Sequence, residues 1–79
     1  MDESELEYLL RVRAAIVDSP ENLAILTPRE RDLLCLRVGL DGGEPRHSFE
    51  IAELYGVNIA RVQVLEARAL RKLKALQSP

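Results

Sequence analysis

Apolar residues recur every three or four positions over residues 2–18, which is the spacing of one face of an α-helix. We predict an amphipathic helix there, ended by the turn-forming residues 18–20. Acidic residues near its start favour the same conclusion, because negative charge stabilises a helix N-terminus. The positions on the predicted face are Leu6, Leu9, Leu10, Arg13, Ile16 and Val17. A short helical turn is predicted over residues 21–26, with its apolar side chains packed inward. These side chains are Leu23, Ile25 and Leu26.

The clearest local signal in the chain begins a second helix. Thr27 is the predicted N-cap, Pro28 occupies the first helical position, and Glu30 closes a capping box. This helix is predicted to run to residue 38. Its buried positions are expected to be Leu33, Leu34, Val38 and, in part, Leu36. We interpret Cys35 as a small core residue of this helix rather than as a reactive thiol.

The sequence pattern over residues 48–67 predicts two short helices joined by a tight turn. Ala52 allows the two helices to approach, and Gly56 supplies the left-handed conformation of the turn. Val62 and then Leu65 fill the angle between the helices. This spacing is typical of a helix-turn-helix.

Caps frame the two helices of this motif. His47 or Ser48 is expected to cap the first, and Asn58 caps the second, which runs to about Leu76. The core face of the last helix is predicted to contain Val62, Leu65, Ala69, Leu73 and Leu76. Its later turns carry the basic residues Arg68, Arg71, Lys72 and Lys74. Two interpretations of these cations remain open: a solvated face that complements the helix C-terminus, or a phosphate-binding face.

Together these patterns predict an all-α fold of four main helices, or five with the turn at residues 21–26. A chain of 79 residues supports one compact domain with a modest core, and its low aromatic content favours a helical core. No apolar run is long enough to span a membrane, and the acidic start is unlike a signal peptide. We therefore expect a cytoplasmic protein without membrane contacts.

Charge is unevenly distributed along the chain. Residues 1–43 contain nine acidic and five basic residues, a net charge of −4, whereas residues 44–79 contain four acidic and six basic residues, a net charge of +2. An independent DNA-binding domain is usually more basic, so we expect weak DNA binding by this chain alone. The sequence contains no nucleophile–base pair, catalytic carboxylate pair or metal-ligand set, and its single cysteine excludes an internal disulfide. We therefore predict no enzymatic activity, no metal site and no cofactor.

Three segments closely resemble region 4 of primary bacterial sigma-70-type sigma factors: residues 26–46 (LTPRERDLLCLRVGLDGGEPR), 51–57 (IAELYGV) and 66–74 (EARALRKLK). LuxR-type response regulators share the LTPRER start but lack the GLDGGEPR loop and the basic ending. The resemblance covers about residues 23–76. It implies the C-terminal helix-turn-helix domain that binds the −35 promoter element and docks on the flap of the RNA polymerase β subunit. The implied flap surface involves the helix at residues 27–38 and the first helix.

The resemblance also suggests how the chain is divided. Residues 1–22 are an N-terminal amphipathic acidic helix and turn, which would replace the usual linker. Residues 23–79 are the sigma-region-4-like helix-turn-helix, and both parts belong to one compact domain.

The recognition helix departs from the family pattern. After the Gly-Val turn the family typically has Thr-Arg-Glu-Arg-Val-Arg-Gln-Ile-Glu, whereas this chain has Asn-Ile-Ala-Arg-Val-Gln-Val-Leu-Glu over residues 58–66. The family residues that contact phosphates and base edges match Ile59, Ala60, Gln63 and Val64 here. Only Gln63 retains a side chain able to pair with a base edge. The resemblance therefore implies a retained scaffold with weakened or altered −35 recognition.

Helix geometry gives the altered positions a common direction. At about 100° per residue, Ala60, Val64, Ala67 and Arg71 face away from the predicted core. Three interpretations of this stripe remain open: scattered exposed small residues, contact with a partner helix, or apolar contact with thymine methyl groups. Phe49 is expected to be partly exposed near the capping turn, either adding to this apolar surface or reflecting a local repacking.

These observations favour a stand-alone sigma-region-4-like transcription regulator that acts through the RNA polymerase β flap, another transcription regulator or a second copy of itself. If Met1 is the true start, the chain lacks a promoter-melting region and does not initiate transcription as a sigma factor. The candidate protein interface consists of Ile59, Ala60, Val64 and Ala67. The alternative function is sequence-specific binding of the −35 element by a sigma factor fragment. The candidate DNA-binding residues are Asn58, Arg61, Gln63, Arg68 and Arg71.

Overall fold

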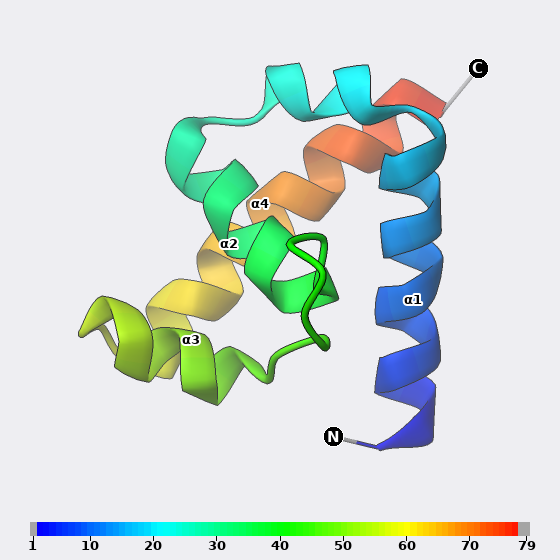
Figure 1. Ribbon diagram of the computed structural model, residues 1–79. Helices are drawn as coiled ribbons and strands as arrows, with labels where there is room; N and C mark the ends of the chain where they lie inside the picture. Colours follow the sequence, from blue (N-terminus) through cyan, green and yellow to red (C-terminus); the bar gives the residue numbers. More distant parts are fainter. Residues whose placement is uncertain (1, 78–79) are drawn as a thin grey trace.

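The structure is a computed structural model that describes residues 2–77. Every regular element in this range is helical, so the predicted all-α fold is confirmed. The elements are α1 (Glu3–Asp18), the 3-10 helix η1 (Pro20–Ile25), α2 (Pro28–Val38), α3 (Ser48–Tyr55) and α4 (Ile59–Gln77). Figure 1 shows α1 on one side of the molecule and α3 on the other, with α2 and α4 between them.

Side-chain caps explain where three of the helices begin. Asp2 caps α1, because its carboxylate accepts a 2.8 Å hydrogen bond from the Glu5 N–H. The predicted capping box of α2 is present: the Glu30 N–H donates to Thr27 Oγ1 (3.2 Å), and the Thr27 N–H donates to Glu30 Oε1 (2.9 Å). Asn58 Oδ1 accepts from the Arg61 N–H at 2.9 Å, which confirms the predicted cap of α4.

Of the two residues expected to cap α3, His47 is the one that does so. Its Nδ1 accepts a 3.0 Å hydrogen bond from the Phe49 N–H, while the Glu50 carboxylate accepts from the His47 N–H at 3.5 Å. Ser48 is the first residue of α3 and is buried. The imidazole of His47 therefore has a local structural role at the start of this helix.

Two apolar clusters form the core. The first lies between α1, α2 and the later turns of α4 and contains Leu9, Ile16, Leu26, Leu34, Val38 and Ala69. The second lies inside the helix-turn-helix and contains Leu33, Ile51, Ala52 and Val62. The neighbouring residues Leu33 and Leu34 belong to different clusters, so α2 is shared between the two halves of the molecule. Helix α4 is shared in the same way.

Several side chains predicted to be buried are exposed. On α1, the buried face follows Leu9, Val12 and Ile16, because α1 packs only along that narrow stripe. The exposed residues that were predicted to be core are Leu6, Leu10, Val17, Ile25 and Leu76. The apolar contacts of α4 with the first cluster end at Leu73, one turn before Leu76.

Two glycines end helices in the left-handed conformation. Gly39 follows α2 with φ 77°, and Gly56 follows α3 with φ 67°. Their surroundings differ: a Cβ on Gly39 would lie 2.5 Å from the Gly43 carbonyl oxygen, whereas a Cβ on Gly56 would meet nothing within 4 Å. The first turn is therefore closely packed and the second is open.

None of the described helices combines the length and the apolar character needed to cross a bilayer.

Candidate functional site

The helix-turn-helix is built as the sequence predicts. Ala52 and Val62 are buried against Leu33 and Ile51, so α3 and α4 approach closely at this point. The Val57 N–H donates to the Ala52 carbonyl at 3.1 Å, which closes the end of α3 before the chain enters α4. The left-handed Gly56 makes this turn possible. The scaffold of the motif is therefore complete.

The candidate protein-interface residues are all exposed. Ile59 is 37 % exposed and Val64 is 46 % exposed, and the small side chains of Ala60 and Ala67 also face solvent. Ala67 lies seven residues after Ala60, on the same side of α4 but two turns further along the helix. Ala67 lies in the wall of a groove between α1 and α4, with a volume of about 600 Å³, which we call the α1–α4 groove. The free outward face of the first two turns of α4 is thus formed by Ile59, Ala60 and Val64.

The candidate DNA-binding residues are exposed too, but they lie on different sides of α4. Arg61 and Arg68 are seven residues apart and share one side. Gln63 lies two positions after Arg61, about 160° around the helix, and Arg71 lines the α1–α4 groove. The Asn58 side chain is already engaged as the cap of α4. The structure therefore does not bring these five residues together.

A second cation lies beside Arg61. Arg29 of α2 and Arg61 of α4 line a hollow of about 250 Å³ next to the turn, together with Tyr55, Val57 and Leu65. The Arg29 guanidinium lies 5.0 Å from the centroid of the Tyr55 ring, within the range of a cation–π contact. Arg29 was not predicted from the sequence, since its proximity to Arg61 depends on how α2 crosses α4.

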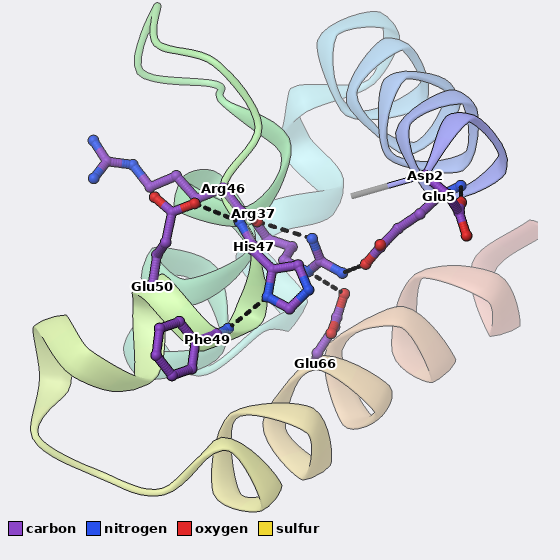
Figure 2. Close-up of polar contacts among 8 residues, drawn as sticks. All are labelled: Asp2, Glu5, Arg37, Arg46, His47, Phe49, Glu50 and Glu66. Atoms are coloured by element: carbon purple, nitrogen blue, oxygen red, sulfur yellow. Dashed lines mark hydrogen bonds and ion pairs between the residues drawn. The ribbon is translucent and has the colours of Figure 1, made fainter.

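A buried arginine joins the helix-turn-helix to α1 (Figure 2). Arg37 of α2 is 5 % exposed and donates through three different nitrogens. Its Nε donates to Glu66 of α4 at 2.9 Å, its Nη1 to the Arg46 carbonyl at 2.8 Å, and its Nη2 to the Glu5 carboxylate of α1. These three contacts of Arg37 were not predicted from the sequence. The available signal was the position of Arg37 three residues after Leu34, on the core-facing side of α2.

Lys72 is part of a second long-range ion pair. Its Nζ donates to Glu30 Oε1 at 2.7 Å, and Glu30 is buried. The hydrogen bond from Lys72, followed by that from the Thr27 N–H, lowers the pKa of the Glu30 carboxyl below its ordinary value, although burial acts in the opposite direction. Lys72 is therefore tied to the fold, which separates it from Arg68, Arg71 and Lys74.

Two other described side chains, Cys35 and Tyr55, have shifted pKa values. Cys35 is half-buried, and burial raises the pKa of its thiol, so the neutral form dominates at physiological pH. Burial likewise raises the pKa of Tyr55. Within residues 2–77, no group of three or more His, Cys, Asp or Glu side chains is placed to hold a metal ion.

Comparisons with known proteins identify the family. Residues 23–75 match the family described as Sigma-70, region 4. RNA polymerase sigma factor sigF (chloroplastic) of Arabidopsis thaliana and RNA polymerase sigma factor SigA1 of Synechococcus elongatus are each 50% identical over 52 residues. That alignment covers 66% of this chain but only 10% and 13% of the two relatives. RNA polymerase sigma factor SigA of Nostoc sp. is 46% identical over 57 residues, which is 72% of this chain and 15% of the relative. No solved structure matches.

The chain spans only 10% to 15% of the length of these relatives. Within that span, the matched residues contain α2, the complete helix-turn-helix and nearly all of α4. Because the family match covers well over half of the sequence and the fold contains the expected motif, this chain belongs to the sigma-70 region 4 family.

Proposed function

We propose that this chain regulates transcription through contact with RNA polymerase or a regulatory partner, in the cytoplasm, and that it recognises −35-type DNA weakly or in altered form. The observation that carries this proposal is the outward face of α4. Its first two turns present Ile59, Ala60 and Val64 to solvent, on a scaffold that is otherwise complete. In a DNA-reading helix, this face carries polar side chains that pair with base edges.

Energetic considerations support weak recognition. Each polar base contact contributes roughly 1–3 kcal/mol to discrimination, so losing two or three removes most of the preference for one site. The net charge of −2 also limits non-specific attraction to phosphates. A longer protein or a complex containing this region would supply the missing positive charge.

The same face suits a protein contact. Small side chains such as Ala60 let a second helix approach to within about 8–10 Å, and Val64 offers an apolar anchor. By family membership, we propose the β flap of RNA polymerase as a partner, with α1 and α2 as its surface. A second copy of this chain is the other candidate for the α4 face. We further propose that residues 1–22 are an appended element and that residues 23–79 form the region-4 unit.

The test compares two exposed apolar residues. Val64→Glu places a charge on the outward face of α4, and Leu54→Glu places the same charge on α3, outside the proposed flap surface on α1 and α2. We expect Val64→Glu to weaken binding to purified RNA polymerase, or dimerisation measured by sedimentation, at least tenfold, while Leu54→Glu changes neither by more than twofold. Equal behaviour of the two variants would refute the role of this face.

A second function is favoured by the paired cations at the turn. Arg29 and Arg61 line one hollow beside the start of the recognition helix, where a DNA phosphate can approach. On this alternative the chain binds the −35 element, with base readout through Gln63. A duplex carrying that element should then bind with a steep salt dependence, and the double variant Arg61→Ala/Gln63→Ala should abolish binding. Arg31→Ala, at an exposed position outside the hollow, is the control.

A further inference from the structure

The α1–α4 groove has an apolar floor. Ile16 at its base is buried, and Val12, Leu70 and Leu73 are half-buried beside it. The groove exists because α1 packs mainly on α2 and η1 rather than on α4. Ala15 on one wall and Ala67 on the other contribute only methyl groups, so the space between the helices is not filled from within.

All the charged residues that line the groove are basic. Arg11 on α1 and Arg71 and Lys74 on α4 are exposed and line both walls, and no carboxylate lines the groove. Among residues 2–77 the ion pairs involve Arg37 and Lys72 but none of these three cations. The acidic residues of α1, including Glu7 and Asp18, are not among the residues that line the groove. An apolar floor between basic walls is complementary to a ligand that is both apolar and negatively charged.

We propose that the α1–α4 groove binds an acidic amphipathic helix of a partner protein. The apolar stripe of such a helix would cover Val12, Leu70 and Leu73, and its flanking carboxylates would meet Arg11 and Lys74. Binding of an amphipathic helix in an apolar groove is a common recognition mode, and the two alanines allow close helix packing. The walls expose about two turns of each helix, a length suited to a helical ligand.

A second copy of this chain is a poor occupant. Its exposed apolar stripe on α1 consists of Leu6, Leu10 and Val17, flanked by acidic residues. That stripe lies roughly 170° around α1 from Tyr8 and Ala15 in the groove wall. If the stripe of one copy entered the groove of another, the two copies would therefore not form a closed two-fold dimer. Further copies would add in the same way and give an open-ended assembly. The groove instead favours a helix from a different protein.

This site is distinct from the outward face of α4. One wall belongs to α1, which lies outside the residues matched to the family. Because Ala67 and Arg71 are also candidates for other contacts, they are not suitable for the test. Arg11, Ala15 and Lys74 lie outside the proposed contacts of the first two turns of α4. Arg11 and Ala15 belong to α1, which is also part of the proposed flap surface, so the groove is tested with a peptide and without polymerase.

The test uses a fluorescently labelled 16-residue peptide as the probe. It carries leucine at positions i, i+4, i+7 and i+11 and mainly glutamate elsewhere, and a matched peptide replaces glutamate with lysine. In fluorescence anisotropy with the full chain, we expect the acidic peptide to bind at least tenfold more tightly than the basic one, with affinity falling as salt rises. The charge-reversal variant Arg11→Glu/Lys74→Glu should weaken binding at least tenfold. Arg31→Glu, away from the groove, should leave it unchanged.

A steric variant gives an independent check. Ala15→Phe fills the groove from an exposed position, and Ala14→Phe makes the same change on an exposed position of α1 outside the groove. Only Ala15→Phe should reduce peptide binding, again at least tenfold, while circular dichroism of both variants stays that of the parent chain. Equal binding of the acidic and basic peptides, or unchanged binding by Ala15→Phe, would overturn the proposal. Binding of dodecanoate but not of the acidic peptide would overturn it as well, by assigning the groove to a small anionic amphiphile.

Discussion

The helix-turn-helix half and the α1 half of this molecule are stabilised by different kinds of contact. In the helix-turn-helix, the cap of α3, the turn at Gly56 and the cap of α4 all lie within about a dozen consecutive residues. The α1 half depends on contacts between distant segments. Arg37 reaches Glu5 across 32 positions, and Lys72 reaches Glu30 across 42 positions.

This difference explains why one half carries a recognisable pattern and the other does not. Local signals fix the motif and are visible in a single sequence. The packing of α1 depends on a buried charge and on a narrow apolar stripe. Neither can be identified from the sequence of α1 alone, because each is defined by its contacts with other helices. The two halves share α2 and α4, so global unfolding is expected to involve both, while smaller openings that expose amides to exchange can be confined to one half.

The largest effect is expected from removing the charge that joins the halves. Arg37→Met leaves Glu66, Glu5 and the Arg46 carbonyl without their donor, and we expect the free energy of unfolding to fall by about 3–5 kcal/mol. Urea denaturation measures this loss. Glu5→Gln retains the arginine and changes only the more exposed partner, so its effect should be clearly smaller. Similar losses in the two variants would contradict the central role of Arg37.

Neighbouring leucines allow each cluster to be weakened separately. Leu33→Ala and Leu34→Ala each remove a fully buried side chain, and each should lower the free energy of unfolding by about 2–5 kcal/mol. Amide hydrogen exchange distinguishes them: Leu33→Ala should accelerate exchange in α3, and Leu34→Ala in α1. The same exchange pattern in both variants would show that the two clusters act as one.

The two glycines that end α2 and α3 form a smaller comparison. Gly56→Ala meets no neighbouring atom, so it should cost roughly 1–2 kcal/mol for the left-handed backbone alone. Gly39→Ala adds a clash with the Gly43 carbonyl oxygen and should be more destabilising than Gly56→Ala. Thermal unfolding of both variants tests the order. The reverse order would mean that the open helix-turn-helix turn is the more constrained of the two.

The smallest expected effect is a pH dependence in the contact between α2 and α4. Because the pKa of Glu30 is lowered by folding, its ionised form stabilises the protein above the ordinary value of 4.5. This contribution is lost as the pH falls through the lower pKa of the folded state. An NMR titration of the carboxyl carbon should show a pKa below 4.5, and Lys72→Met should raise it. An unchanged titration in that variant would remove Lys72 as the main cause.

Much of the fold was predictable from local chemistry. The caps at Thr27 and Asn58, the turn at Gly56 and the buried Leu33, Leu34, Val38, Val62 and Ala69 were all expected and are observed. The face of α1 was predicted less well, since its two apolar stripes lie roughly 100° apart and both satisfy helical spacing. Only the position of its neighbours decides which stripe is buried, and it is the one containing Val12.

The candidate site was predictable in part. The outward direction of Ala60 and Val64 followed from helix geometry and agrees with their exposure. The ion pair between Arg37 and Glu66 had a signal, because opposite charges occupy core-facing positions of α2 and α4. Three other features left no signal in the sequence, because each depends on how two helices are placed relative to each other. They are the ion-pair partner of Arg37 on α1, the Arg29–Arg61 hollow and the α1–α4 groove. The assignment of individual residues to DNA or protein contact stays a prediction.

The three hydrogen bonds that Arg37 donates have a consequence for protein engineering. A lysine carries a single nitrogen and does not reproduce three donors aimed at three segments, so Arg37→Lys is not a conservative change. Transplanting α1 onto another member of the family therefore requires more than a matching apolar stripe. The recipient needs an arginine at the position of Arg37, and the graft needs a carboxylate in the first turn, where Glu5 lies. With both present, the arginine anchors an added N-terminal helix through an ion pair.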